Sequence, residues 1–282
     1  MDIELHDDFS PEKIARSGQC FRVKRFPDDT YRFITRGHVL YLRERSPGVI
    51  SAECGREEWD AVWRPYFDLD RSYRAVRERI PETDPFLKRA ADFGAGLRVL
   101  KQDPWEMLVT FIASQRKSIP AIAANIEAVS ERYGRSMETP YEKVFLFPEP
   151  EEMKDADAAG LSACGLGYRV PYVLDAVRCV TCGCLCLEAP GRGDGNTACS
   201  PEELRETLKQ VKGVGDKVAD CVALFAYGRT EAAPVDVWIR QVMDRYYGGK
   251  DPFAPYGTDA GILQQYAFYY AVSHRAETRS GI

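Results

Sequence analysis

The chain has 282 residues, of which 45% are hydrophobic and 29% charged, so it can bury a core and is not expected to be disordered. Its net charge of -5 excludes a general attraction to polyanions, and its nine cysteines, an odd number, argue against a secreted disulfide framework. No stretch approaches the roughly 18 apolar residues of a membrane span, and the N-terminus lacks a signal-peptide pattern. We therefore expect a soluble intracellular protein, with any nucleic-acid site confined to a local patch.

The first 50 residues alternate apolar and polar positions in short segments that turn residues separate. The apolar pairs are Phe21 and Val23, Tyr31 and Phe33, and Val39 and Tyr41. This pattern predicts an antiparallel meander. From about residue 55 the spacing becomes helical and stays so to the end. We predict an α+β protein, with an antiparallel-sheet domain that includes some helix over residues 1–95 and a mostly helical domain over residues 96–282.

Two helix starts share the same capping sequence. Asp103-Pro104-Trp105-Glu106 and Ser200-Pro201-Glu202-Glu203 each combine a capping side chain, a first-turn proline and a glutamate that can bond back to the cap. A third helix is predicted between Ser118 and Tyr133, with Gly134 as the left-handed residue that ends it. Residues 188–199 have the composition of an exposed loop.

A glycine turn interrupts a helical pattern between residues 208 and 238. The turn is Lys212-Gly213-Val214-Gly215, and the helical spacing resumes immediately after it, which predicts a helix-hairpin-helix. Gly213 and Gly215 would let backbone N–H groups approach a phosphate oxygen, which the positive end of the second helix also favours. Taken alone, the glycines fit a simple corner between packed helices equally well.

Lys217 lies in the first turn of that second helix. The helix dipole disfavours a cation there and so favours the neutral amine that a nucleophile needs. A lone lysine is nevertheless most often a solvated surface group. In the following Pro234-Val235-Asp236-Val237 segment, Asp236 is placed to cap the next helix. Its carboxylate could at the same time stabilise a cationic sugar, since capping and catalysis are compatible.

G-V-G-D-K-V-A-D-C, with the aspartate of P-V-D-V nineteen residues after its lysine, resembles the helix-hairpin-helix DNA glycosylases, specifically the 8-oxoguanine DNA glycosylase family. The resemblance implies that Lys217 is the nucleophile and Asp236 the catalytic aspartate. Cys221 corresponds to the family's pocket cysteine, although a small buried apolar side chain explains it equally well.

Segments at both ends of the chain extend this resemblance. Residues 17–22 read S-G-Q-C-F-R, similar to the family's S-G-Q-x-F-R, which implies that the carbonyl of Gly18 accepts the N7 hydrogen that distinguishes 8-oxoguanine from guanine. Residues 260–268 resemble the base-pocket helix, in which Gln264 and Phe268 share one face and would hold the base edge and stack on the base. The alternative is that Phe268 belongs to the core and Gln264 is solvated.

Residues 165–169 read G-L-G-Y-R, as in the family. The resemblance implies that Tyr168 wedges into the duplex and that Arg169 contacts the orphaned base, which offsets part of the cost of extruding a nucleotide. The alternative is a loop that ends a helix and buries its tyrosine.

The chain departs from the family after Phe111-Ile112-Ala113-Ser114, where an asparagine run is replaced by Gln115-Arg116-Lys117-Ser118. Ala121 stands near the family's arginine, which leaves the opposite-base preference open. Arg116 and Lys117 are candidate phosphate contacts, with solvated surface as an equal alternative. Trp238 replaces a histidine and so removes a phosphate contact.

Four cysteines precede the hairpin at positions 179, 182, 184 and 186. Their steps of three, two and two suit an extended segment with free thiols better than a tetrahedral metal cage formed locally. We therefore predict no metal among these residues, and no cofactor other than a monovalent ion that the backbone of the hairpin could bind.

The resemblance implies a bifunctional DNA glycosylase/AP lyase that excises 8-oxoguanine from duplex DNA through a lysine Schiff base and β-elimination. We expect double-stranded DNA with oxidised guanine as the partner, a monomeric state, and a location with the nucleoid of a bacterial cytoplasm or in a eukaryotic nucleus. Two alternatives remain: a glycosylase for alkylated or other bases on the same fold, and a non-enzymatic helix-hairpin-helix DNA-binding protein.

Overall fold

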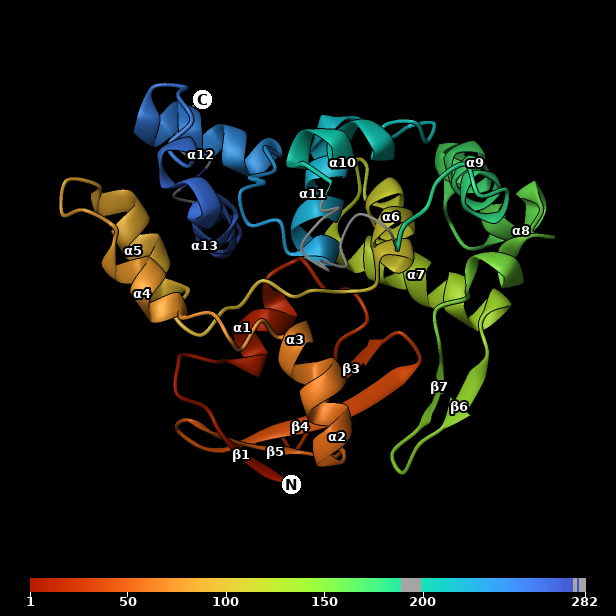
Figure 1. Cartoon of the computed structure of the whole chain (residues 1–282), viewed down its shortest axis with the longest axis horizontal. Helices are drawn as coiled ribbons and strands as arrows, with labels where there is room; N and C mark the ends of the chain where they lie inside the picture. Colours follow the sequence, from red (N-terminus) through yellow and green to blue (C-terminus); the bar gives the residue numbers. More distant parts are fainter. Residues whose placement is uncertain (189–198, 276–277, 279–282) are drawn as a thin grey trace. The chain divides into compact units, whose positions relative to one another are not determined.

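The computed structural model describes residues 1–188, 199–275 and 278, and Figure 1 labels its elements. The chain divides into two compact units. The first unit consists of Met1–Arg32, Leu40–Lys101 and Gly228–Ile282, and the second of Phe33–Val39 and Gln102–Tyr227. The predicted loop at 188–199 lies, apart from its two end residues, outside the described residues.

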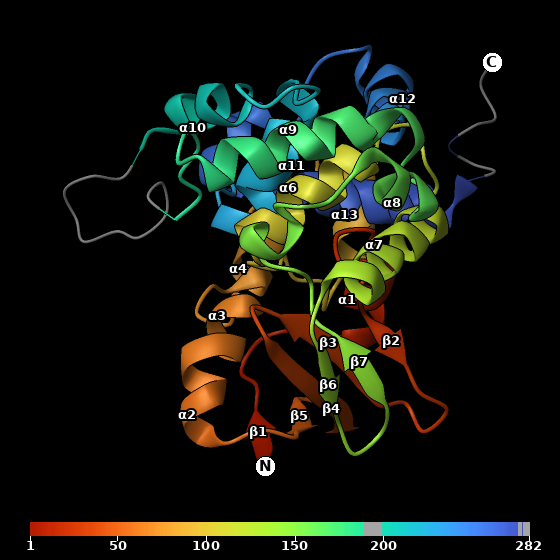
Figure 2. The ribbon, with the colours of Figure 1, turned by 90° about the vertical axis from the view of Figure 1, so that its right-hand side faces the viewer.

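The N-terminal part of the chain forms an antiparallel sheet with the order β1-β5-β4-β3-β2. The strands are β1 (Asp2–Glu4), β2 (Lys24–Arg25), β3 (Tyr31–Thr35), β4 (His38–Ser46) and β5 (Val49–Ala52), and Figure 2 shows them from the side. The tip of the β3–β4 hairpin, Phe33–Val39, belongs to the second unit. The predicted meander is confirmed for β3 and β4. The strand predicted at Phe21 and Val23 is wrong, because these residues lie in the turn before β2.

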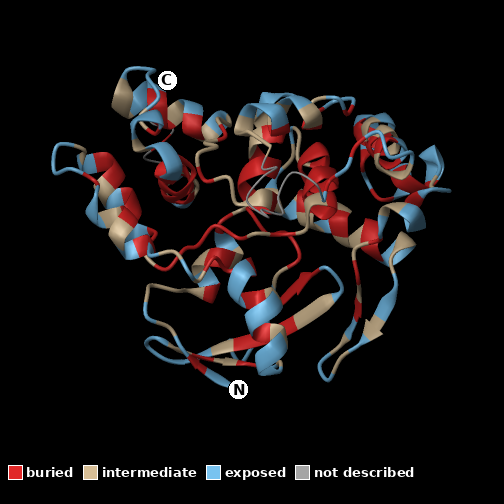
Figure 3. Cartoon of the chain, in the orientation of Figure 1, coloured by how far each residue is buried: buried red, intermediate tan, exposed pale blue. Residues whose placement is uncertain are grey.

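The first unit also contains helices from both ends of the chain. They are α1 (Pro11–Arg16), α2 (Arg56–Glu58), a π-helical turn (Trp59–Trp63), α3 (Arg64–Tyr66), α4 (Tyr73–Glu78), α5 (Pro85–Phe93), α12 (Val237–Tyr247), a 3-10 turn (Ala254–Asp259) and α13 (Ala260–Ser273). α13 packs against α5 and α12. Every residue of α13 from Ala260 to Ala271 is buried except Phe268, as the red ribbon in Figure 3 shows for most of its length.

A buried arginine fixes the loops of the first unit. The guanidinium of Arg98, 1% exposed, donates to the carbonyls of Asp8, Phe67, Asp68 and Arg71. A buried guanidinium is tolerated only where acceptors replace its water, and here four carbonyls do so.

The second unit is mostly helical. Its elements are α6 (Pro104–Ala113), α7 (Ile119–Tyr133), β6 (Ser136–Glu138), β7 (Lys143–Phe145), a 3-10 turn (Pro150–Met153), α8 (Ala158–Ala163), a 3-10 turn (Gly167–Arg169), α9 (Val170–Thr181), α10 (Pro201–Leu208) and α11 (Asp216–Tyr227). The β6–β7 hairpin interrupts the helical character that the sequence was expected to keep. The α+β class, a sheet followed by helices, is confirmed.

α6 and α11 form the centre of this unit. Residues 105–113 of α6 are all buried, and all of them except Glu106 and Thr110 are apolar, as expected for a helix in the core of a unit. Phe111 of α6 stacks on Phe225 of α11 with ring centroids 5.5 Å apart. This stack fixes the helix that carries Lys217 against the α6 helix.

The end of α7 differs from the prediction. Gly134 follows Tyr133 as expected, but its φ is -87° and its ψ 164°, so it is extended and not left-handed. A Cβ at this position would collide with the carbonyl oxygen of Leu146. Glycine is therefore needed for a close backbone approach, a reason that helical periodicity does not reveal. Within the described part of the chain, no helix has the length and apolar character to cross a membrane.

Candidate active site and DNA-contacting loops

The predicted helix-hairpin-helix is confirmed by α10, the glycine turn and α11. Ser200 begins α10 with both bonds of a capping box, since its Oγ accepts from the N–H of Glu203 and its own N–H donates to the Glu203 carboxylate. Gly213 has a φ of +83°, and a Cβ on it would collide with the ring of Tyr172. The first glycine of the hairpin is therefore fixed by both conformation and contact.

The hairpin backbone is only partly satisfied within the protein. The N–H of Lys212 donates to Oδ2 of Asp175 on α9 at 2.8 Å, while the N–H groups of Gly213 and Gly215 meet no acceptor among the described residues. Burial opposes a lower pKa for Asp175, but hydrogen bonds from Arg178 and from the Lys212 backbone hold that pKa below its ordinary value. Two hairpin donors are thus left for a bound anion.

Lys217 is half-buried in the first turn of α11. Its Nζ lies 5.3 Å from the centroid of the Phe111 ring, and across residues 1–188, 199–275 and 278 it meets no carboxylate within ion-pair distance. The neighbouring carboxylate of Asp216 pairs with Lys209 at 3.0 Å instead. The amine of Lys217 therefore rests on an aromatic ring without a counter-ion. One turn further along α11, Cys221 is 4% exposed.

In the first unit, Asp236 caps α12 as predicted. Its Oδ1 accepts from the N–H of Ile239 at 2.8 Å. The preceding Pro234 is held by Gln264 of α13, whose Nε2 donates to the Pro234 carbonyl at 2.9 Å. Gln264 is 3% exposed, and its Oε1 has no hydrogen-bond partner within the described chain. The predicted alternative of a solvated Gln264 is therefore wrong.

Gly18 lies in a turn that the same helix holds. The φ of Gly18 is +73°, which favours glycine. The carbonyl of Ser17 accepts from Nε2 of Gln265 at 2.8 Å, and the side chain of Gln19 donates to the Arg98 carbonyl at 2.9 Å and accepts from the Leu100 N–H at 2.7 Å. Adjacent glutamines of α13 thus hold the Ser17–Gly18 turn and the segment before Asp236. Phe268, on the same helix, is half-exposed and so is available for stacking.

The predicted DNA contacts of the second unit fall into two groups. Tyr168 is 52% exposed, and Arg116 is exposed with a φ of +54°. Arg169 is buried; its guanidinium lies 4.2 Å from the Tyr168 ring and donates to the carbonyls of Leu166 and Gln115. Lys117 donates to the Gly165 carbonyl at 2.6 Å and to Asn125. Arg169 and Lys117 therefore tie the loops together, whereas Tyr168 and Arg116 project outward.

Sequence reasoning missed Gln115. Its carbonyl accepts from Arg169 and lies 3.5 Å from the Tyr168 hydroxyl, while its Nε2 donates to the Gly213 carbonyl at 3.1 Å. One residue thus joins the turn after α6, the loop at 165–169 and the glycine hairpin. Its signal in the sequence was the departure from the asparagine run, which we interpreted only as a change in opposite-base reading.

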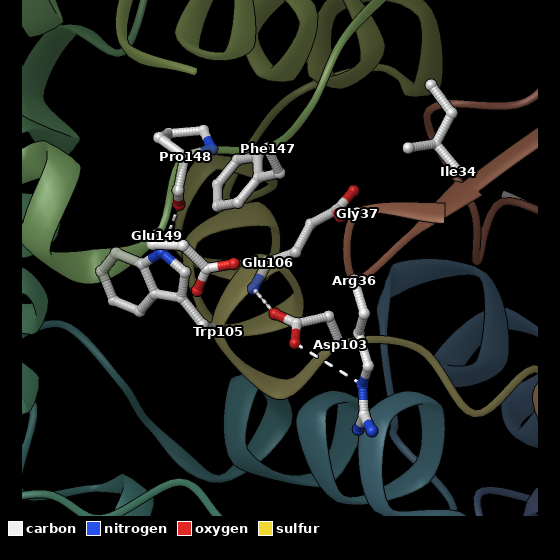
Figure 4. Close-up of a pocket in the computed structure, with 9 residues that line it drawn as sticks. All are labelled: Ile34, Arg36, Gly37, Asp103, Trp105, Glu106, Phe147, Pro148 and Glu149. Atoms are coloured by element: carbon white, nitrogen blue, oxygen red, sulfur yellow. Dashed lines mark hydrogen bonds and ion pairs between the residues drawn. The ribbon is translucent and has the colours of Figure 1, made fainter. Parts of the chain in front are cut away.

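A small pocket in the second unit lies at the start of α6 and is separate from these loops (Figure 4). Asp103 caps α6 by accepting from the N–H of Glu106 at 2.8 Å, and its second oxygen lies 3.7 Å from Nε of Arg36. Trp105 donates to the Pro148 carbonyl at 2.9 Å. Burial raises the pKa of Asp103, and it also raises the pKa of Glu149 on the other side of the pocket. Nothing in this pocket resembles the predicted active site.

All nine cysteines are free of disulfide bonds. Among the described residues no three His, Cys, Asp or Glu side chains are grouped so that they could hold a metal ion.

Two family models cover most of the chain. Residues 3–108 match the N-terminal domain of 8-oxoguanine DNA glycosylase, and residues 109–255 match the HhH-GPD superfamily of base excision DNA repair proteins. The chain belongs to the HhH-GPD superfamily and carries the N-terminal domain of its 8-oxoguanine DNA glycosylases. The resemblance inferred from the motifs is confirmed.

Individual relatives agree with this assignment. The 8-oxoguanine glycosylase/lyase of Clostridium acetobutylicum, solved with double-stranded DNA containing cytosine opposite 8-oxoguanine, is 31% identical, with a TM-score of 0.88 and 98% of each chain covered. The probable N-glycosylase/DNA lyase of Methanothermobacter thermautotrophicus is 29% identical over 94% of each chain. The N-glycosylase/DNA lyase of Saccharomyces cerevisiae is 32% identical over 71% of this chain and 54% of its own.

Proposed function

We propose that the chain is a bifunctional DNA glycosylase/AP lyase that excises 8-oxoguanine from double-stranded DNA in base excision repair. Family membership and glycosylase/lyase relatives that match nearly the full length of the chain support this activity. The observation that carries the proposal is the amine of Lys217, which lies on the Phe111 ring at the start of α11 and pairs with no carboxylate in the described chain. An amine without a counter-ion on an apolar surface is suited to act as a nucleophile.

In this mechanism Nζ of Lys217 forms a bond to C1′ of the damaged nucleotide as the bond from C1′ to the base breaks. The departing base takes up a proton, and opening of the sugar ring gives an imine between Lys217 and the sugar. Removal of a proton from C2′ then expels the 3′ phosphate, which cleaves the strand by β-elimination. Asp236 stabilises the positive charge that develops on the sugar, while its Oδ1 caps α12 by accepting from the N–H of Ile239.

The base pocket is assigned to Gly18, Cys221, Gln264 and Phe268. The carbonyl of Gly18 accepts the N7 hydrogen of 8-oxoguanine, whereas the N7 of guanine is itself an acceptor and is repelled, a difference on the order of a few kcal/mol. The Oε1 of Gln264, buried and without a partner in the described chain, is suited to the base edge, and the half-exposed Phe268 is suited to stacking.

The hairpin and the loops around Gln115 bind the DNA backbone. Gly213 and Gly215 supply two N–H donors to a phosphate, Tyr168 wedges into the duplex, and Arg169 orients Tyr168 from below its ring. We also propose a monovalent ion on hairpin carbonyls. The carbonyls of Val211 and Gly213 each accept one hydrogen bond already, but each has a second lone pair for such an ion. No step of the chemistry is assigned to it.

Further parts of the proposal concern the partner and the setting. The enzyme acts as a monomer on duplex DNA, in the compartment that holds the chromosome. Light scattering of the purified protein, alone and with a duplex, tests the monomeric state.

Borohydride trapping on a duplex with a single 8-oxoguanine tests the nucleophile. Wild type is expected to give a covalent protein–DNA complex and to release free base, and Lys217→Gln is expected to lose both while it still binds the duplex. Lys212→Gln, a lysine exposed on the same hairpin, is the matched control and should trap normally. Trapping by Lys217→Gln would refute this assignment.

The same assay separates the alternatives. Release of an alkylated base without trapping would indicate a glycosylase that uses Asp236 and no amine nucleophile. Binding without release of any base from a panel of damaged duplexes would indicate a non-enzymatic DNA-binding protein.

A further inference from the structure

The turn that ends α9 brings two cysteines to the surface. Cys182 is the C-cap of α9, and its N–H donates to the Arg178 carbonyl at 2.9 Å. Gly183 follows with a φ of +74°, which reverses the chain. Leu185 then donates back to the Cys179 carbonyl at 2.9 Å. The chain therefore folds back within three residues, with Cys182 and Cys184 on either side of the glycine.

Burial alternates along the next residues. Leu185 and Leu187 are 3% and 7% exposed, whereas Cys182, Cys184 and Cys186 are exposed. The leucines therefore anchor the segment and turn the cysteines outward. The alternation of burial from Cys184 to Leu187 explains the step of two between Cys184 and Cys186, whereas Cys182 lies before the glycine turn, at the end of α9.

The two thiols of the turn are in direct contact. The sulfur of Cys182 accepts hydrogen bonds from the thiol and the backbone N–H of Cys184, and the guanidinium of Arg178 adds positive charge nearby. These hydrogen bonds lower the pKa of Cys182 below its ordinary value, and the same thiol–thiol bond raises the pKa of Cys184. The pair is therefore unequal, since Cys182 forms a thiolate more readily than Cys184 does.

We propose that Cys182 and Cys184 form a redox-active dithiol that reacts with low-molecular-weight disulfides such as glutathione disulfide. The Cys182 thiolate attacks one sulfur of the glutathione disulfide, which forms a mixed disulfide and releases one glutathione. The Cys184 thiolate then attacks Sγ of Cys182, which breaks the mixed bond, forms the intramolecular disulfide and releases a second glutathione. Two protein thiols are oxidised and one glutathione disulfide is reduced to two thiols.

The other cysteines lack one or more of these features. Cys20, Cys164 and Cys221 are buried. Burial raises the pKa of Cys54 to about 11. Cys179 is buried, and although its sulfur lies 3.5 Å from Nη2 of Arg178, burial and Asp175 raise its pKa. These five cysteines are therefore less suited to react than the exposed Cys182 and Cys184.

Intact-mass measurement of the full-length protein tests the proposal. The reduced protein is treated with glutathione disulfide, and wild type is expected to lose the mass of two hydrogens without a lasting adduct, with the disulfide mapped to the peptide that contains Cys182 and Cys184. Cys184→Ser should accumulate one glutathione on Cys182, because the resolving thiol is absent. Cys182→Ser should react at least tenfold more slowly.

Cys186→Ser is the matched control, since Cys186 is exposed on the same segment two residues further on. It should form the disulfide as wild type does. A lasting glutathione adduct on wild type, loss of the reaction in Cys186→Ser, or a disulfide mapped to other cysteines would each overturn the proposal.

Phenylarsine oxide provides a second test, because trivalent arsenic bridges two neighbouring thiolates. The reduced protein should bind one equivalent tightly, and Cys182→Ser and Cys184→Ser should each lose this binding while their thermal unfolding stays unchanged. Binding by either variant as tight as that of wild type would contradict the pairing. The proposal does not depend on glycosylase activity.

Discussion

The two units hold their candidate functional residues in contrasting ways. In the first unit, Gln264 and Gln265 of the buried helix α13 hold the segments before Asp236 and around Gly18. In the second, the half-exposed Gln115 joins the hairpin to the loop that carries Tyr168. The residues predicted to recognise the base are thus anchored in a core, whereas those predicted to contact DNA are joined by bonds at the surface. Changes in the first should affect stability and chemistry together, and changes in the second mainly DNA binding.

The largest effect is expected at the glycine hairpin, where the predicted DNA contact depends on backbone conformation. Gly213→Ala places a Cβ at a φ of +83° and against the Tyr172 ring, and the conformational cost alone is about 1–2 kcal/mol. The midpoint of thermal unfolding and the affinity for duplex DNA should both fall.

Gly215→Ala separates the two consequences. A Cβ at Gly215 meets nothing within 4 Å, so stability should be kept. DNA affinity, measured by fluorescence anisotropy, should still fall if a phosphate approaches this glycine. Unchanged affinity in both variants would show that the hairpin is only a corner between helices.

The next largest effect is expected at Gln265, the buried residue that holds the Ser17–Gly18 turn. Gln265→Ala leaves the Ser17 carbonyl without its donor at a site where Gln265 is 2% exposed, and an unsatisfied buried acceptor costs about 1–3 kcal/mol. Chemical denaturation should show this loss, together with weaker discrimination between 8-oxoguanine and guanine. Gln264→Ala should cost less stability, because it also removes an Oε1 that has no partner in the described chain. Equal losses of stability in the two variants would contradict the assignment of Gln265 as the anchor of the Ser17–Gly18 turn.

These two regions also show how far the sequence could lead. The hairpin, the helix starts and the positions of Lys217 and Asp236 could be predicted, because turns, caps and helical spacing are encoded locally. The hydrogen bond from Gln265 to Ser17 joins residues 248 apart in the chain. Such a pairing depends on tertiary packing, and helical periodicity gives no signal for it.

The same limit explains why the sequence did not show that two predicted DNA contacts also bond within the protein. Arg169 was predicted from the motif at 165–169 and Lys117 as a basic residue, and both donate to backbone carbonyls of neighbouring loops. A basic residue in a motif indicates a donor without indicating which acceptor it meets. Gln115 was missed for the converse reason, since it carries no charge.

A smaller effect is expected at Gln115. Gln115→Ala removes the donor to the Gly213 carbonyl at 3.1 Å, a half-exposed bond for which about 0.5–1.5 kcal/mol is expected. Duplex affinity should fall by roughly twofold to tenfold at nearly unchanged thermal stability, with slower unstacking of a 2-aminopurine placed beside the lesion. Gln210→Ala, an exposed glutamine close to the hairpin, should match wild type. A large loss of stability would instead show that Gln115, like Gln265, stabilises the fold.

The smallest effect is expected at Asp103, which is predicted neither to contact DNA nor to recognise the base. Burial raises the pKa of Asp103, although the Glu106 N–H and Arg36 favour its charged form. A carboxyl whose pKa is raised by folding stabilises the fold most when protonated, and this contribution is lost as the pH rises through the raised pKa.

Asp103→Asn keeps a capping side chain without the buried charge. At pH 7 its thermal unfolding midpoint should equal or slightly exceed that of wild type. As the pH falls toward 4 the difference should narrow, because wild type regains the protonated form. A variant much less stable than wild type at pH 7 would mean that the ion pair with Arg36, 3.7 Å long and half-exposed on the arginine side, outweighs the cost of burying the carboxylate.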